Sequence, residues 1–157
     1  MDILFSSTSQ RTLSVALSIL LKYLHQDERD IRQWRSIRSC ILNDLNTVVC
    51  EGQFSALSAL FILASYPQGR QLLIDDAGLR GKVTTLGLNA VIAEGQEKDK
   101  SALFFLAGNH DGLQLLEEDK ALRNKITDRG LNAIVAEGDD KGKSALFCLA
   151  DTAEGIE

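Results

Sequence analysis

The residues with the clearest chemical potential lie near the C-terminus, where residues 138–144 read GDDKGKS. A phosphate-binding loop has the pattern G-x-x-x-x-G-K-S/T, because its backbone N–H groups must converge on the phosphates while the lysine and hydroxyl reach the outer phosphate and Mg²⁺. Here the turn is one residue short, and Glu137 stands where the first glycine is required. Asp139 and Asp140 would also repel a phosphate. Nucleotide binding at this loop is therefore only a minor alternative function.

Catalytic and metal-binding patterns are equally weak elsewhere in the chain. His110, one of two histidines, lies in GNHDG, where no second His or Cys follows at the spacing that a zinc site needs. The acidic residues cluster in loop-like stretches such as EEDK rather than in apolar surroundings. The three cysteines lie among apolar residues, as reduced core thiols do. The sequence therefore predicts a non-enzymatic protein with no catalytic residue, no metal and no cofactor.

The lysine and serine of GDDKGKS recur 43 residues earlier, since AEGQEKDKSALF at 93–104 matches AEGDDKGKSALF at 136–147. The apolar stretch SALFFLA at 101–107 has gap-free counterparts at 58–64 and 144–150, and a fainter one at 16–20. Self-similarity at a period of about 20–50 residues is the signature of a repeat architecture. The repeated Lys-Ser pair fits the start of a buried helix, capped by the serine, better than Mg²⁺ chemistry.

Each copy predicts three short helices. The stretch LNAVIAE at 88–94 and its counterpart at 131–137 follow a glycine and end at Gly95 or Gly138, a natural left-handed cap. SALFFLA has almost no polar face and must be buried on most sides. A third amphipathic stretch covers residues 112–126. Because no stretch alternates as an exposed strand would, we expect an all-α chain.

The run LASYPQGRQLLIDDAGLRGKV at 63–83, with its counterpart at 106–126, resembles the junction of armadillo-type repeats. Armadillo and HEAT units have a similar period. The resemblance implies a right-handed α-α superhelix of short helices. It places a degenerate unit at about 1–44, units at about 45–87 and 88–130, and an incomplete unit at 131–157, all in one domain.

Two departures qualify the armadillo resemblance. SALFFLA is shorter than the third armadillo helix, which lines the binding groove of that family. GKSALFCLA at 142–150 is also similar to the TPLHxA helix of ankyrin repeats. The ankyrin unit, however, is about 33 residues long and needs a β-turn element, which the sequence does not reveal.

Charge and hydropathy limit the class of partner. The net charge of −5 argues against broad nucleic-acid binding, which needs a basic face. The N-terminus lacks the basic region of a secretory signal, and Val15–Leu21 is too short to span a membrane. We expect a cytoplasmic protein that binds another protein or peptide as a scaffold or adaptor, in the host cytoplasm if it is a secreted effector. The alternative is a docking or regulatory region of a larger enzyme.

Candidate binding residues form two groups. The first surrounds a tryptophan in DERDIRQWRSIRSC, since Trp and Arg are frequent at interface hot spots; a core tryptophan with solvated arginines is the alternative. The second flanks the SALFFLA helices, whose inner ridge is the other expected binding face. The first group comprises Arg29, Arg32, Trp34, Arg35 and Arg38, and the second Lys100, Asn109, His110 and Lys143.

Two polar columns recur in register: Asn46, Asn89 and Asn132 in one, and Glu51, Glu94 and Glu137 in the other. We expect the asparagines to bind backbone at helix starts. The glutamates predict an inter-repeat ladder, with Arg80 or Arg123 as partner, or else an acidic stripe. Because the chain stops in mid-repeat and arrays need a polar end cap, we expect either a fragment of a longer array or an end covered by another subunit, such as a homo-oligomer through the uncapped repeat.

Overall fold

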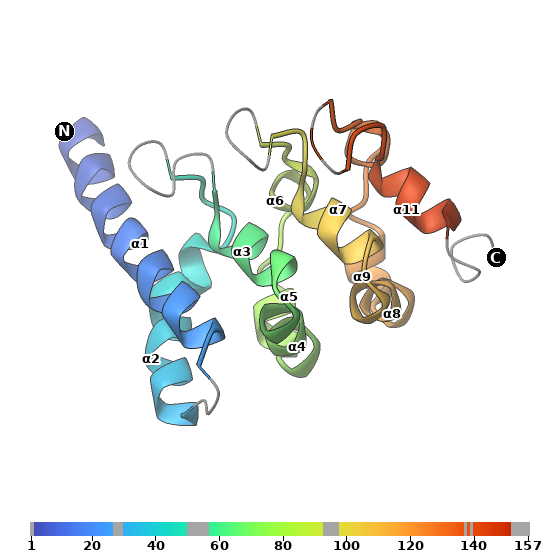
Figure 1. Ribbon diagram of the computed structural model, residues 1–157. Coiled ribbons are helices and arrows are strands. Elements are labelled where there is room, and N and C mark those ends of the chain that lie inside the picture. Colours follow the sequence, from blue (N-terminus) through green and yellow to red (C-terminus); the bar gives the residue numbers. More distant parts are fainter. Residues whose placement is uncertain are drawn as a thin grey trace.

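The computed structural model describes residues 2–26, 30–49, 57–92, 98–136, 138 and 140–151, with side chains from Leu13 to Leu149 within these ranges. Every regular element in them is a helix, so the expected all-α class is confirmed (Figure 1). No helix among these residues is long and apolar enough to cross a membrane.

Two helices and one helical turn form the N-terminal part: α1 (Asp2–Leu24), α2 (Ile31–Ile41) and η1 (Leu42–Asp44). The carboxylate of Asp30 accepts a hydrogen bond from the Arg32 N–H at 2.8 Å and so caps α2. α1 packs on both α2 and α3. Tyr23 of α1 stacks on Trp34 of α2, with ring centroids 5.9 Å apart.

Four helices come next and recur 43 residues later, with the same bounds except that α7 is one residue shorter than α3. The first unit consists of α3 (Ala59–Ser65), α4 (Pro67–Asp75), α5 (Ala77–Arg80) and α6 (Thr85–Asn89). The second unit consists of α7 (Ala102–Ala107), α8 (His110–Glu118), α9 (Lys120–Arg123) and α10 (Asp128–Asn132), and α11 (Ala145–Asp151) follows it. α3, α7 and α11 pack side by side in a row, with α4 and α8 below them (Figure 1).

The serine caps predicted from sequence are confirmed. The hydroxyls of Ser58, Ser101 and Ser144 each accept a hydrogen bond from the backbone N–H three residues later, at 3.0–3.1 Å. Each cap satisfies an N–H that would otherwise be orphaned in a buried helix start. The apolar face of the helix can therefore begin directly at the cap.

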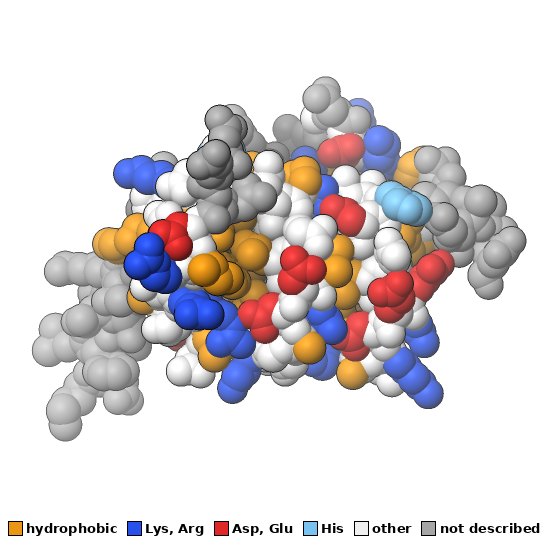
Figure 2. Space-filling view, turned by 90° about the horizontal axis from the view of Figure 1, so that it is seen from below, with side chains coloured by type: hydrophobic (Ala, Val, Ile, Leu, Met, Phe, Trp, Pro, Cys, Tyr) orange, Lys and Arg blue, Asp and Glu red, His pale blue; other side chains and the backbone are white. Residues whose placement is uncertain are grey.

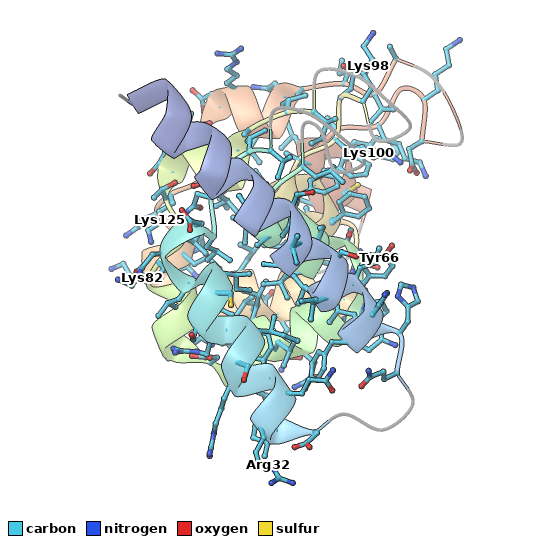
Figure 3. The ribbon with its side chains drawn as sticks, turned by 90° about the vertical axis from the view of Figure 1, so that its left-hand side faces the viewer. Arg32, Tyr66, Lys82, Lys98, Lys100 and Lys125 are labelled. Carbon is cyan, nitrogen blue, oxygen red and sulfur yellow. The ribbon has the colours of Figure 1, made fainter. Side chains whose placement is uncertain are left out.

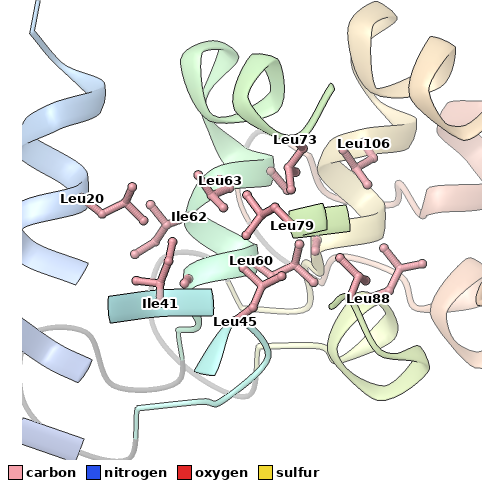
Figure 4. Packing of buried hydrophobic residues seen from close by; sticks show 14 of the residues in the cluster. Leu20, Ile41, Leu45, Leu60, Ile62, Leu63, Leu73, Leu79, Leu88 and Leu106 are labelled. Atoms are coloured by element: carbon pink, nitrogen blue, oxygen red, sulfur yellow. The ribbon is translucent and has the colours of Figure 1, made fainter. Parts of the chain in front are cut away.

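Tight contacts between helices require glycine at two equivalent positions. A Cβ on Gly69 would lie 2.3 Å from the carbonyl oxygen of Leu63, and a Cβ on Gly112 would lie 2.3 Å from that of Leu106. α4 and α8 thus start directly against the backbone of the preceding helix. Buried leucines from both units then fill one continuous core between the helices (Figure 4).

The sequence prediction is wrong for two helices. The single helix expected over 112–126 is two, because Asp119 leaves the helical conformation and its carboxylate accepts the Leu122 N–H at 3.0 Å, which starts α9. The helix expected over 88–94 ends at Asn89, and Ala90 is extended at φ −64° and ψ 129°. Gly138 has a positive φ of 90°, but in a loop rather than at a helix end.

A backbone hairpin replaces the expected end of that helix. The Ile92 N–H donates to the Lys100 carbonyl at 2.9 Å, and the Asp99 N–H donates to the Ile92 carbonyl at 2.8 Å. Val135 makes the same pair of bonds with Lys143 and Gly142, at 2.9 and 2.8 Å. β-branched residues favour extended backbone, and burial of the Ile92 and Val135 side chains fixes it. The chain therefore contains a turn element of the kind that was not evident in the sequence.

Candidate interaction surfaces

The asparagine column joins successive units through their backbones. The side-chain amide of Asn89 donates to the carbonyl of Lys125 at 2.8 Å, and its Oδ1 accepts from the Thr127 N–H at 3.0 Å. Asn46 makes the same two bonds to Lys82 and Thr84, at 2.8 and 3.1 Å. The expectation that these side chains bind backbone at helix starts is confirmed for both residues.

Gly87 and Gly130 are explained by the same contacts. A Cβ at either position would lie 2.0 Å from the Oδ1 of the asparagine in the preceding unit. The asparagine and the glycine 41 residues later are thus one structural pair. The glutamate column lies outside the described residues. Arg80, one of its expected partners, instead binds Asp119 at 2.8 Å and the carbonyls of Leu73 and Ile74.

The arginines around Trp34 do not form one surface. Trp34 is buried against α1, whereas Arg32 and Arg35 are exposed. Arg38 donates from Nε to Asp76 at 2.6 Å, which ties α2 to the start of α5. This hydrogen bond is the main reason why the pKa of Asp76 lies below its usual value. Arg29 lies outside the described residues.

Lys100 and Lys143 share one aspartate. Their ammonium groups lie 3.2 and 3.3 Å from the two carboxylate oxygens of Asp140. Burial raises the pKa of Asp140, but the two lysines together outweigh it and bring the pKa below its usual value. The Gly142 and Lys143 N–H groups donate to the carbonyls of Val135 and Asp140, at 2.8 and 3.0 Å. The lysine and these amides of GDDKGKS are therefore engaged within the loop.

A small aromatic cleft lies beside the other predicted residues. Lys100 lies 5.7 Å from the ring centroid of Phe105, and the Asn109 side-chain amide donates to the Phe105 carbonyl at 2.7 Å. His110 begins α8 and is exposed. This front cleft has a volume of about 240 Å³ and is lined by Leu21, Leu57, Phe61, Ile62, Ser65, Tyr66 and Phe105. Of the second predicted group, Lys100 and Asn109 thus contact Phe105 of the cleft, whereas His110 lines a separate hollow on α8 and Lys143 pairs with Asp140.

Figure 3 shows that Tyr66, Lys98 and Lys100 lie on one side of the molecule, while Lys82 and Lys125 lie on the opposite side. Those two lysines precede α6 and α10, whose exposed faces make a second and larger hollow. This α6–α10 groove has a volume of about 660 Å³. It is lined by Thr85, Leu86, Asn89, Ala90, Val91, Thr127 and Arg129.

Leu86 projects at the groove with 81% of its surface exposed. Ala90 and Val91 also line a smaller hollow of about 130 Å³ that reaches Val48, so the apolar lining extends across the first unit. Sequence reasoning missed this groove. The signal available was Leu86 in TTLGLN, an apolar residue whose counterpart 43 residues later is Arg129.

Charged groups are distributed unevenly over the surface. Seen from below, several basic side chains lie at the α2 end, others lie along the far end of the face, and acidic side chains are spread between them (Figure 2). Within the described ranges, no group of three or more His, Cys, Asp or Glu side chains is arranged to hold a metal ion.

Comparison with protein families, with curated proteins and with solved structures finds no match to this chain.

Proposed function

We propose that the chain is a non-enzymatic protein-binding scaffold whose partner inserts apolar side chains into the α6–α10 groove. The observation that carries this proposal is the groove itself, which has a volume of about 660 Å³ and is walled mainly by apolar groups. Binding pockets typically occupy about 300–1,000 Å³ and are mostly apolar with a few polar groups. An exposed leucine at the edge of such a hollow is a natural anchor for a partner.

The groove also restricts the chemistry of the partner. Leu86, Ala90 and Val91 give it an apolar wall, and Arg129 is an exposed cation on α10. Asn89 contributes little, because its amide and oxygen are already bound to backbone. The expected ligand is a protein segment with branched or aromatic side chains next to a carboxylate that can pair with Arg129.

The arrangement of helices supports a repeat scaffold of ankyrin type over the armadillo resemblance. An ankyrin unit combines two helices with a β-turn, and α3–α4 and α7–α8 are such helix pairs next to a backbone hairpin. The unit here is about ten residues longer than the usual 33. The short helices α5 and α6, and α9 and α10, follow each pair and account for the added length. The α6–α10 groove would therefore be built on the added helices.

The test is photo-crosslinking in a cell extract, with the photoreactive group placed at position 86 of the chain. A photoreactive phenylalanine replaces Leu86 in one variant and Ile31 in another, because both side chains are exposed and apolar. We expect a discrete protein adduct from position 86 that excess unlabelled chain suppresses and that position 31 does not give. Adducts of the same pattern from both positions, or none from 86, would contradict the proposal.

The front cleft is the second candidate surface, favoured by the placement of Lys100 against Phe105. A third photoreactive variant at Tyr66, which lines that cleft, tests it in the same extract. A competed adduct from position 66 alone would move the binding site to the row of α3, α7 and α11. The expected scaffold function would then stand, with the face changed.

A further inference from the structure

α11, the last described helix, exposes groups that are covered at equivalent positions of α7. Leu103 in α7 is 0% exposed, whereas its counterpart Leu146 in α11 is 48% exposed. Phe104 is 6% exposed and its counterpart Phe147 is 46% exposed. α11 packs on α7, as α7 packs on α3. Where this face is covered, it is therefore covered by the equivalent helix of the following unit.

In the portion of the chain that the structure describes, Asn132, on the same face, makes only the local one of the hydrogen bonds that Asn89 makes. The Asn132 side-chain amide donates to the Asp128 carbonyl at 2.8 Å, just as that of Asn89 donates to the Thr85 carbonyl at 2.7 Å. In Asn89 the remaining amide hydrogen and the Oδ1 bind the next unit. In Asn132 the side chain is exposed instead, held in the same local hydrogen bond.

Arg123 likewise makes the hydrogen bonds that Arg80 makes within its own unit. Arg80 donates to two carbonyls of its own unit and, through Nε, to Asp119 of the next unit at 2.8 Å. Arg123 donates to the carbonyls of Leu116 and Glu117, at 3.2 and 2.6 Å. In the described part of the chain, no carboxylate lies on its Nε.

We infer that the face formed by Arg123, Asn132, Leu146 and Phe147 is a docking surface for a further helical unit of the same 43-residue pattern, stacked as the second unit stacks on the first. The contacts between the first and second units define which residues this further unit must carry. An aspartate at a helix N-cap must meet Arg123, as Asp119 meets Arg80. A Thr-x-x-Gly helix start must meet Asn132, because only glycine leaves room for the asparagine oxygen. This surface is separate from the α6–α10 groove and does not depend on it.

The test supplies that unit within the full chain. A second copy of residues 101–143 is inserted after Lys143, before Ser144, which leaves every original residue in place. In this extended chain, the copy of Asp119 follows Arg123 by 39 residues, the separation of Arg80 and Asp119. The copy of Thr127 follows Asn132 by 38 residues, the separation of Asn89 and Thr127.

Asn132→Ala is then compared in the natural and extended chains by urea unfolding. We expect a small shift of the urea midpoint in the natural chain. In the extended chain we expect a shift as large as the one that Asn89→Ala causes in the natural chain. Gln114→Ala, at an exposed position of α8, is the matched control and should have a small effect in both chains. Hydrogen exchange gives a second readout: the amides of α10 and of the helix after Lys143 should gain protection in the extended chain.

Two results would overturn the inference. In the first, Asn132→Ala has the same small effect in both chains and the amides of α10 gain no protection. In the second, the natural chain dimerises with rising concentration in sedimentation experiments and Phe147→Asp abolishes the dimer, because a second copy of the chain would then be the occupant.

Discussion

Asn89→Ala should destabilise the chain far more than the same substitution one unit later. Asn89 is 9% exposed and makes three hydrogen bonds, at 2.7, 2.8 and 3.0 Å. Two of these bonds cross to the second unit, so their loss also leaves the Lys125 carbonyl and the Thr127 N–H without these partners. The substitution therefore weakens both the helix end and the contact between units.

The magnitude follows from the number of bonds. A buried hydrogen bond contributes about 1 kcal/mol net, and an unsatisfied buried partner costs about 1–3 kcal/mol. Alanine regains about 0.5 kcal/mol through its higher helix propensity. The expected loss is about 2–4 kcal/mol of unfolding free energy for Asn89→Ala.

Asn46 and Asn132 provide internal controls. Asn46 is half-buried and makes two bonds to the next unit, which predicts a loss of about 1–2 kcal/mol. Asn132 is exposed and makes one bond within its own helix, which predicts a loss below about 0.5 kcal/mol. The same residue type at three equivalent positions thus predicts a graded series.

The assay is equilibrium urea unfolding followed by far-UV circular dichroism, with free energies compared at a common m-value. The reasoning is refuted if Asn132→Ala costs as much as Asn89→Ala, because the inter-unit bonds would then contribute nothing beyond the local one. A change of m-value in Asn89→Ala alone would indicate that the units unfold separately in that variant.

Two further predictions concern backbone contact and pH. Gly112→Ala should destabilise the chain by more than about 2 kcal/mol, since its Cβ would meet the Leu106 backbone at 2.3 Å. Gly81→Ala should be neutral or stabilising by up to about 1 kcal/mol, because the φ of Gly81 is −62° and its nearest contacts are ordinary at 3.5 Å. Thermal melts that rank the two variants alike would contradict this prediction. The Arg38 hydrogen bond lowers the folded-state pKa of Asp76, so this contribution to stability is present above the unfolded-state pKa of about 3.9 and is lost as the pH falls through the folded value. Urea midpoints at pH 6 and pH 3 should therefore show a gap between the natural chain and Asp76→Asn that shrinks in acid, and a constant gap would be the contrary result.

Features that depend on neighbours in sequence could be predicted. The serine caps and the register of the units follow from residues within a few positions of each other or from the 43-residue match. The role of the asparagines was also predictable as binding to backbone. Their glycine partners 41 residues later were not, because that pairing depends on how closely two units pack.

The errors arose where long-range contacts override local preference. LNAVIAE has helical apolar spacing, but Ile92 pairs with Lys100 and stays extended. Asp119 reads as one more polar residue in an amphipathic stretch, yet its carboxylate caps a new helix and binds Arg80. The α6–α10 groove needs two helices 43 residues apart, so a single unit of sequence does not reveal it.

The central claim is that a protein partner binds through the α6–α10 groove. The most direct measurement is the affinity of the Leu86→Asp variant for the partner that crosslinking identifies. Burial of a leucine side chain contributes about 1.5–3 kcal/mol, so calorimetry should show a dissociation constant raised about 10- to 100-fold. Ile31→Asp, with the same change at an exposed apolar residue on α2, should leave the affinity unchanged. An unchanged dissociation constant for Leu86→Asp, in a chain that remains folded, would contradict the account.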